Sequence, residues 1–311
     1  MAITASMVKE LRELSGAGMM ECKKALNETD GNMEEAIEFL RKNGQAKAEK
    51  KASRVAAEGL CCVASNGTTE AAIVEVNSET DFVANNEKFQ TYVQEVAEQA
   101  LSSNASDIDA FMAEAWNKDS SKTVAEELVE KIAVIGEKLS IRRFEKLTAE
   151  NGAVISYTHG NGRIAVLLAA ECGNVTEDVK EALKNVAMQI AAMSPKFLRE
   201  SDIDQDYIDH ETEIIKAQIE NDPKESAKPE NVKAGMIKGR LNKIFKEVCL
   251  LDQVYVKAED GKQNVQKYLE EVAKAAGTEL TLTSFVRFET GEGIEKKQEN
   301  FAEEVAKQMN N

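Results

Sequence analysis

The sequence repeats one pattern of predicted elements, a β-hairpin followed by an amphipathic helix. Two pairs of apolar, strand-like runs lie on either side of turns that contain glycine: 59–64 and 71–76 around Asn66-Gly67, and 153–157 and 164–169 around Gly160-Asn161-Gly162. Asn-Gly is a strong signal for a tight hairpin turn. A helical pattern follows each hairpin, and the second copy begins about 90 residues after the first. The repeat predicts two duplicated subdomains with small antiparallel sheets, packed against one another.

The composition favours an α+β protein in which helices predominate. A chain of 311 residues is long enough for two or three domains. Only three prolines occur, and alanine, glutamate and lysine are abundant. The formal net charge is -16. Because binding to a phosphate backbone depends on lysine and arginine, we expect proteins as partners and no direct contact with nucleic acid.

The cysteines and the N-terminus indicate a cytoplasmic protein. The five cysteines form no paired spacing: Cys22, Cys61, Cys62, Cys172 and Cys249. We expect them to be buried as small apolar residues in a reducing cytosol. Charged residues such as Lys9 and Glu10 interrupt the first apolar run, and no other run approaches the length of a membrane span.

The remaining segments divide the chain into further predicted units. These are 1–44, a three-helix docking domain; 45–57, a linker; 58–148, core subdomain N; 149–200 with 249–290, core subdomain C; 201–248, a helical-hairpin dimerisation module; and 291–311, a C-terminal helical module. Asn43-Gly44 is predicted to end the third helix of the docking domain. The linker is interpreted as a solvated helix, although its lysines leave a nucleic-acid patch as the less favoured alternative.

The second copy of the repeat is interrupted by the predicted helical hairpin. Apolar residues in its second arm alternate at spacings of four and three, which is typical of a coiled-coil seam: Ile237, Leu241, Ile244 and Val248. The hairpin is therefore a candidate for a homodimer contact or for an internal support. Elsewhere, we expect helices at 108–116, 124–135 and 265–275, and strands at 139–147, 254–256 and 280–289.

An apolar side chain stands out in the loop that follows the first hairpin. Thr80, Asp81, Phe82 and Val83 lie between the strand at 71–76 and the next helix. A phenylalanine at such a tip leaves apolar area in water unless something covers it. Either Phe82 folds back on the following helix, or Phe82 and Asp81 are presented to a partner.

Two methionines raise a similar question in the docking domain. Met19 and Met20 follow Gly16-Ala17-Gly18 directly. Methionine side chains adapt to irregular surfaces, so these residues are candidates for a partner contact, with the core of the bundle as the alternative.

No pattern of catalytic residues is recognisable. The two histidines, His159 and His210, lie in different parts of the chain. The sequence contains no nucleophile elbow, no P-loop and no complete dinucleotide-binding fingerprint. We therefore expect a protein that acts by binding, with neither a metal nor a cofactor of its own.

Four stretches resemble the bacterial translation elongation factor Ts family, and they occur in the order that the family shows. They are ITASMVKELRELSGAGMMECKKAL (3–26), TDFVANN (80–86), SYTHGNGRIAVLL (156–168) and VRFETGEGIEK (286–296). The resemblance covers nearly the whole chain. It departs from the family at Asn86, where many relatives carry Lys or Asp, and in segments 104–122 and 254–278, which look longer than in compact members.

The resemblance implies a guanine nucleotide exchange factor for elongation factor Tu. It implies that the docking domain is like a ubiquitin-associated (UBA) domain and that 201–248 is a dimerisation module. It also implies that the loop of Thr80, Asp81, Phe82 and Val83 disturbs the magnesium and GDP held by the partner. Met19 and Met20 would contact the partner's nucleotide domain, as would the tail helix, and His159 and Gly160 its C-terminal barrel domain.

Two other classes of function stay open at this stage. A non-catalytic adaptor could use the bundle and the helical hairpin to tether proteins without changing nucleotide affinity. An enzyme could use a cleft between the two core subdomains, but this would need converging ionisable groups that the sequence does not show.

Overall fold

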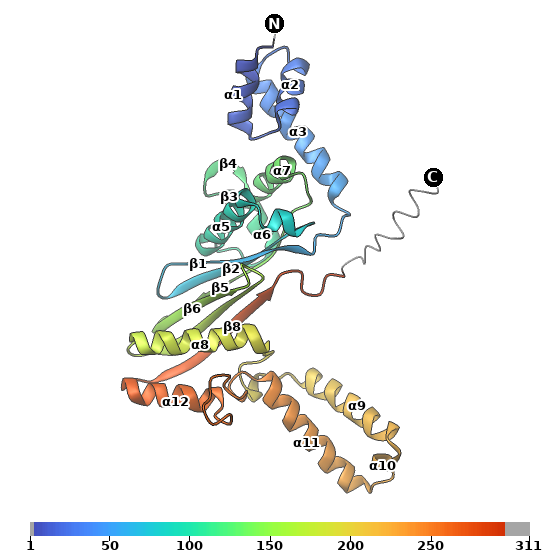
Figure 1. Cartoon of the computed structure of the whole chain (residues 1–311), viewed down its shortest axis with the longest axis vertical. Coiled ribbons are helices and arrows are strands. Elements are labelled where there is room, and N and C mark those ends of the chain that lie inside the picture. The colour runs from blue at the N-terminus through green and yellow to red at the C-terminus, as the bar shows by residue number, and fades with distance from the viewer. Residues whose placement is uncertain (1–2, 296–311) are drawn as a thin grey trace.

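The two repeated hairpins form two separate three-stranded antiparallel sheets. The computed structural model describes residues 3–295 (Figure 1). The first sheet has the order β1-β2-β5, with β1 at Glu58–Ser65, β2 at Glu70–Ser78 and β5 at Ser140–Thr148. The second has the order β6-β7-β8, with β6 at Gly152–His159, β7 at Ile164–Cys172 and β8 at Leu280–Glu289. Both predicted hairpins and their antiparallel pairing are confirmed.

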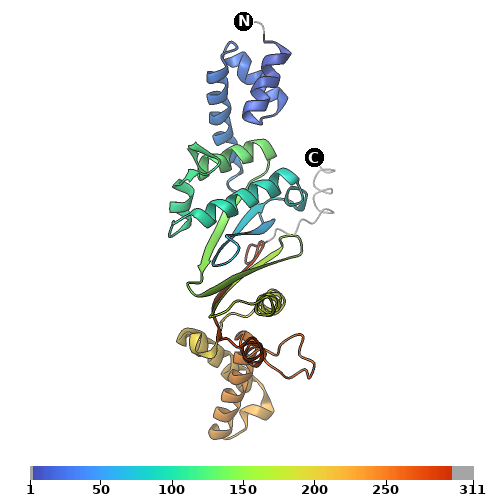
Figure 2. The same ribbon diagram turned by 90° about the vertical axis from the view of Figure 1, so that its left-hand side faces the viewer.

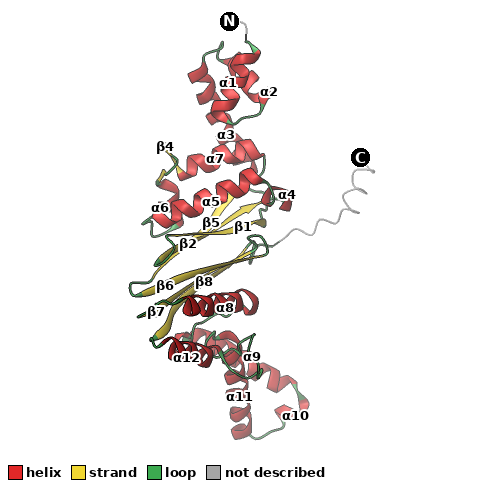
Figure 3. Cartoon of the chain, turned by 60° about the vertical axis from the view of Figure 1, so that its left-hand side comes forward, coloured by secondary structure: helices red, strands yellow, loops and turns green. Residues whose placement is uncertain are grey.

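The sheets stack face to face, and one long helix covers the outer face of each. α5 (Glu87–Ser102) lies on the first sheet and α8 (Glu177–Met193) on the second, which gives the helix–sheet–sheet–helix layers of Figures 2 and 3. Alternation along a strand divides its side chains between two cores. In β2, Val74 faces α5 while Ile73 faces the other sheet, where it meets Leu167 and Phe288. The α+β class and the duplicated subdomains are thereby confirmed.

The N-terminal residues form a three-helix bundle. Its helices are α1 (Ala5–Ser15), α2 (Met19–Glu28) and α3 (Met33–Lys51), and they pack around Leu11, Cys22 and Leu26. The predicted three-helix bundle is therefore present, whereas its likeness to a UBA domain stays a prediction.

The predicted end of the third helix at Asn43-Gly44 is wrong. α3 continues to Lys51 because Gly44 is buried in a contact with α7 (Val124–Ile135). A Cβ atom at Gly44 would lie 3.5 Å from that of Ala133, which is an ordinary van der Waals contact, so Gly44 is an interior helix residue that packs on α7 and does not end the helix. Much of the predicted linker is therefore a helix that joins the bundle to the core.

Two shorter segments also differ from expectation. The helix expected at 108–116 is α6 (Ile108–Ala113), and it ends before Trp116. Trp116 belongs to β3 (Ala115–Trp116), which pairs with β4 (Asp119–Thr123), and its indole is buried near Tyr92 with ring centroids 6.1 Å apart. Tertiary packing of this one large ring outweighs the local helical pattern.

The strand expected at 254–256 is absent, since the only bridge that Val254 makes within the described chain is to Asn264. The side-chain amide of Gln189 donates to the carbonyl of Val254 and accepts from the N–H of Val256, at 3.1 and 3.0 Å. These backbone groups are therefore satisfied by a buried side chain and not by a neighbouring strand.

A helical hairpin projects from the second subdomain (Figure 1). It consists of α9 (Gln205–Asn221), the short α10 (Pro223–Ser226) and α11 (Glu230–Val248), and α12 (Val265–Ala276) follows. Ile215 and Ile219 of α9 are buried, but no residue of α11 is fully buried. The hairpin is confirmed, and a coiled-coil seam stays a prediction. The predicted tail helix lies at 295–309, almost wholly outside the described residues. None of the helices between residues 3 and 295 has both the length and the apolar character needed to cross a membrane.

A buried carboxylate, that of Glu75 in β2, joins the two sheets. The register between β2 and β5 shifts at this point, so that Arg143 pairs with Glu75 and Arg142 is the extra residue of a bulge. A bulge lets two consecutive side chains reach one neighbour. Arg143 Nε donates to Glu75 Oε2 at 2.6 Å and Arg142 Nη1 to Oε1 at 3.0 Å. The backbone N–H of Gly291, just beyond β8, donates to Oε1 at 2.8 Å.

Hydrogen bonds keep this carboxylate ionised in spite of its burial. Burial alone raises the pKa of Glu75, but the N–H of Gly291 and the amide of Asn77, together with Arg143 and Arg142, lower the pKa below its ordinary value. Because the pKa is lower in the folded chain, the ionised form contributes to stability at neutral pH, and this contribution disappears as the pH falls through the folded-state pKa.

Glu75→Gln should lower the free energy of unfolding at pH 7 by about 2 kcal/mol, measured by urea denaturation. This loss of unfolding free energy is smaller than the loss expected for a fully buried ion pair, because the side chains of Arg142 and Arg143 are 30% and 31% exposed. The difference from wild type should shrink as the pH falls below the ordinary glutamate range and through the lowered folded-state pKa of Glu75, where the wild-type carboxylate becomes protonated. Glu145→Gln, at an exposed position of β5 in the same sheet, is the matched control. A Glu75→Gln loss no larger than that of the control would contradict the assigned role.

Candidate partner-binding site

The loop after β2 presents Phe82 to solvent. Residues Asp81–Ala84 form a single helical turn, α4, between β2 and α5 (Figure 3). The side chain of Phe82 is 85% exposed, whereas Ala84 is buried and Val83 packs against the core under α5. The alternative that Phe82 folds back on the following helix is therefore wrong. Val83 and Ala84 anchor the turn, and this leaves Asp81 and Phe82 on its outer side.

The carboxylate beside this ring is also available for an external contact. Within residues 3–295, the side chain of Asp81 has no hydrogen-bond or ion-pair partner. Only its backbone carbonyl is engaged, by the amide of Asn85 at 2.9 Å. An exposed aromatic ring next to an unpaired carboxylate can insert into an apolar crevice and repel or replace a neighbouring anionic ligand.

Hydrogen bonds fix the start of the turn. The hydroxyl of Thr80 caps α4 by accepting from the N–H of Val83 at 3.3 Å, and it donates to Glu137 Oε1 at 2.7 Å. No local pattern in the sequence indicates that Glu137 contacts this loop. A glutamate that follows Ile135-Gly136 is expected to be an ordinary solvated residue after the end of a helix. The contact with Thr80 spans 57 residues and becomes visible only in the fold.

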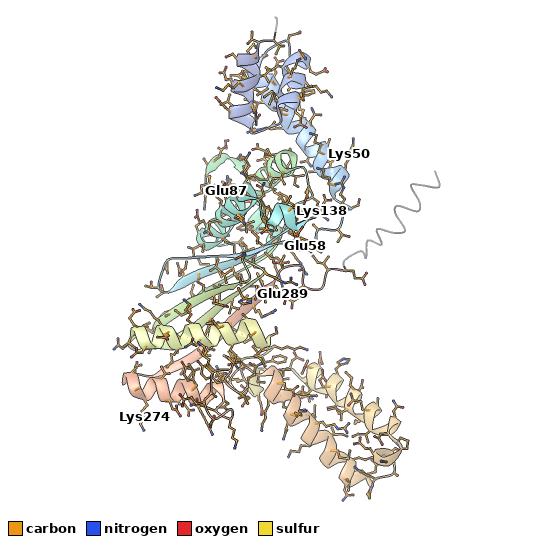
Figure 4. The ribbon with its side chains drawn as sticks, in the orientation of Figure 1. Lys50, Glu58, Glu87, Lys138, Lys274 and Glu289 are labelled. Carbon is orange, nitrogen blue, oxygen red and sulfur yellow. The ribbon has the colours of Figure 1, made fainter. Side chains whose placement is uncertain are left out.

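The turn of the second hairpin lies at the same end of the sheets as the Phe82 loop. His159 is exposed, and its Nδ1 shares a hydrogen bond of 3.0 Å with the hydroxyl of Tyr157. The carbonyl of Gly162 accepts from the N–H of Cys61, near the start of β1, at 2.7 Å. β1 starts opposite the residue where β2 ends, because Glu58 pairs with Ser78. Figure 4 accordingly shows Glu58, Glu289 and Lys138 along one side of the molecule.

The two methionines of the bundle are exposed at the start of α2. Met19 is 59% and Met20 76% exposed, while Cys22, Ala25 and Leu26 supply the buried side of this helix. The alternative that these methionines belong to the core of the bundle is wrong. Figure 3 draws α2 and α4 on the same side of the long axis. The structure thus places Met19, Met20 and Phe82 on separate exposed elements, and their contacts with a partner stay predictions.

The two core subdomains meet through a packed apolar core. Apolar side chains such as Ile73, Leu167 and Phe288 fill the space between the two sheets, where an enzyme would need a cleft. Between residues 3 and 295, no group of three or more histidine, cysteine or acidic side chains is placed to hold a metal ion. Four of the cysteines are buried as predicted, Cys62 is half-buried, and burial raises the pKa of Cys61 to about 12. A cavity of about 660 Å³ lies beside the contact between the bundle and α7 and is lined by residues of both.

Comparisons with known proteins agree on one family. The model of the family described as "Elongation factor TS" matches residues 79–292. The elongation factor Ts of Clostridium novyi (strain NT) is 50% identical over 309 residues, which cover 99% of each chain. That of Clostridium perfringens (strain 13 / Type A) is 52% identical over 306 residues, and that of Trichlorobacter lovleyi 47% over 311, each covering 98% of both chains.

Gly162→Ala should disturb the seating of the His159 turn on β1. Gly162 has a φ of +92°, and an added Cβ would lie 2.9 Å from Leu60 Cδ2 and 3.1 Å from the carbonyl oxygen of Cys61. Gly67→Ala is the matched control, since Gly67 has a φ of +93° with no atom within 4 Å of the added Cβ. Both should lose about 1 kcal/mol of unfolding free energy from the backbone, and Gly162→Ala about 1 to 2 kcal/mol more. If thermal melts show the same loss of unfolding free energy for both variants, the contact of the turn with Leu60 and Cys61 does not resist the added methyl group, and the prediction is wrong.

Proposed function

We propose that this chain, which belongs to the elongation factor Ts family, is a guanine nucleotide exchange factor for elongation factor Tu. It binds the GDP form of that partner in translation elongation, in the cytoplasm, and promotes GDP release. The observation that carries the proposal is the exposure of Phe82, at 85%, on a turn whose neighbours are anchored in the core. Family membership supplies the identity of the partner.

The proposed mechanism is the insertion of the Phe82 turn beside the partner's nucleotide. Phe82 enters between helices of the partner's nucleotide domain, and Asp81 disturbs the groups that hold the water shell of the bound magnesium. Thr80 and Val83 support these two residues, as cap and as anchor. The magnesium ion and the GDP belong to the partner, and this chain contributes neither a metal nor a cofactor.

Energetics require contacts beyond this turn. Weakening nucleotide binding about a thousandfold requires that the factor favour the distorted partner by about 4 kcal/mol. Burial of Phe82 supplies about 1.5 to 3 kcal/mol. We assign the remainder to Met19 and Met20 on the partner's nucleotide domain, to His159 and Gly160 on its C-terminal barrel domain, and to the C-terminal segment.

Turnover follows from linkage without any chemical step. If the factor weakens nucleotide binding by a given ratio, nucleotide must weaken binding of the factor by the same ratio. An incoming nucleotide therefore displaces the factor from its partner. In this proposal the protein is not an enzyme in the chemical sense.

The helical hairpin at 201–248 is proposed as the homodimer contact. Ile214 of α9 is 39% exposed and Val232 of α11 is 41% exposed. Apolar side chains on a projecting pair of helices suit a contact between two copies.

Phe82→Ala should reduce GDP release about 10- to 100-fold, the equivalent of the lost burial of the ring. Binding should weaken less, because the other contacts remain. The measurement is stopped-flow release of fluorescent GDP from elongation factor Tu, with complex formation followed by light scattering. Val254→Ala, which truncates an exposed apolar side chain outside the proposed contacts, is the control and should keep the wild-type rate. A wild-type rate for Phe82→Ala would refute the wedge. A wild-type protein that binds but leaves the GDP off-rate unchanged would be an adaptor.

Light scattering on the isolated chain tests the dimer. The wild type should show about twice the 34.2 kDa mass of one chain, and a double variant, Ile214→Glu with Val232→Glu, should show a single mass. A single-chain mass for the wild type at micromolar concentration would rule out a stable dimer.

A further inference from the structure

We propose that Glu137 is a positioning residue that holds the Phe82 turn in its outward-facing conformation. This inference rests on the proposed exchange function. It assigns a role to a residue that contacts neither the partner nor the nucleotide in that mechanism.

The carboxylate of Glu137 binds the two residues that precede Asp81. Oε2 accepts from the backbone N–H groups of Glu79, at 3.1 Å, and of Thr80, at 3.0 Å. Oε1 accepts from the hydroxyl of Thr80 at 2.7 Å. The same hydroxyl accepts from the N–H of Val83. A continuous set of hydrogen bonds therefore holds the backbone on both sides of Asp81 and Phe82.

A second carboxylate makes the connection reciprocal. Glu79 Oε1 accepts from the backbone N–H of Lys138 at 2.6 Å, so the segments 79–80 and 137–138 bind each other through two carboxylates. The ammonium of Lys138 donates to the carbonyls of Ala52 and Arg54, both at 2.8 Å, and Arg54 donates to Glu79 at 3.2 Å. The loop is thus tied to the end of α7 and to the chain that follows α3.

The position of Glu137 follows from the end of α7. Gly136 adopts a φ of +87° and ends the helix, which turns the chain back toward β2. Ile132, one turn earlier, is buried in the first core, so the helix end has a fixed position. Glu137 therefore projects from a rigid support onto the two residues that precede Asp81 and the exposed ring.

The exposed ring makes such a support necessary. Water favours any movement that brings the apolar surface of Phe82 against the protein, and the one-turn helix α4 is too short to resist this movement alone. Hydrogen bonds to a charged acceptor are stronger than those between neutral groups, and three of them act on two adjacent residues. The carboxylate fixes the direction in which the turn points and does not contribute to a core.

The test is Glu137→Gln, which keeps the size of the side chain but removes its charge and places an amide donor among backbone donors. Release of fluorescent GDP from elongation factor Tu is measured over a range of factor concentrations. At saturating factor the rate should fall about tenfold, the equivalent of about 1.4 kcal/mol. The half-saturating concentration should change by less than about twofold, because the contacts that hold the partner lie elsewhere.

Glu114→Gln is the matched control. Glu114 also accepts two side-chain hydrogen bonds in the same subdomain, from Ser103 at 2.8 Å and from Gln99 at 3.2 Å, but it does not contact the loop. Its variant should exchange GDP at the wild-type rate. Amide hydrogen exchange provides a second measurement on the free protein. The amides of Glu79, Thr80 and Val83 should exchange faster in Glu137→Gln than in wild type and stay unchanged in Glu114→Gln.

The outcomes separate this inference from the proposed function. If the wild type does not accelerate GDP release, the proposed function fails and this inference fails with it. If the wild type is active and Glu137→Gln matches it at saturating factor, only the role of Glu137 is refuted. An equal loss in Glu114→Gln, or unchanged exchange of the amides of Glu79 and Thr80, would also refute that role.

Discussion

The buried carboxylate of Glu75 sets how the two sheets are placed relative to each other. It lies in β2, yet it binds two arginines of β5 and the backbone of Gly291 beyond β8. A buried charge that loses a partner is left uncompensated, which is unfavourable. Moving one sheet relative to the other would separate these groups, so the contact limits such movement. The bulge in β5 is part of the same constraint, because it brings Arg142 and Arg143 to one acceptor. The contact lies at the end of the sheets from which the Phe82 loop and the His159 turn project.

The residues proposed to contact the partner lie on surfaces that the core holds outward. Phe82, Met19 and Met20 are all exposed, and each follows a residue or segment fixed by buried neighbours or hydrogen bonds. Loops that carry function on a rigid scaffold are common, and here the rigidity extends to the backbone just before the exposed ring. The acidic carboxylates around the loop act mainly as acceptors for backbone N–H groups.

Local patterns in the sequence predict most of the fold and only part of the site. Hairpins at Asn66-Gly67 and Gly160-Asn161-Gly162 depend on turn chemistry within a few residues, and both form. The continuation of α3 past Gly44 and the strand at Trp116 depend on Ala133 and Tyr92, which are distant in sequence, so local rules give the wrong element there. For Phe82 the sequence allowed two interpretations, a ring folded back on the following helix and a ring exposed to solvent, and it did not decide between them. Glu137 has no local signal, because its importance comes from a contact across 57 residues.

The uninterrupted run of α3 from Met33 to Lys51 has a geometric consequence. Each residue of an α-helix advances the chain by about 1.5 Å and turns it by about 100°. Adding or deleting one residue between Gly44 and Lys51 would therefore swing the whole bundle around the helix axis and carry Met19 and Met20 to another face. The number of residues in this helix therefore sets both the distance of the bundle from the core and its rotation about the helix axis. Insertions would be tolerated there only if they add close to a whole number of helical turns.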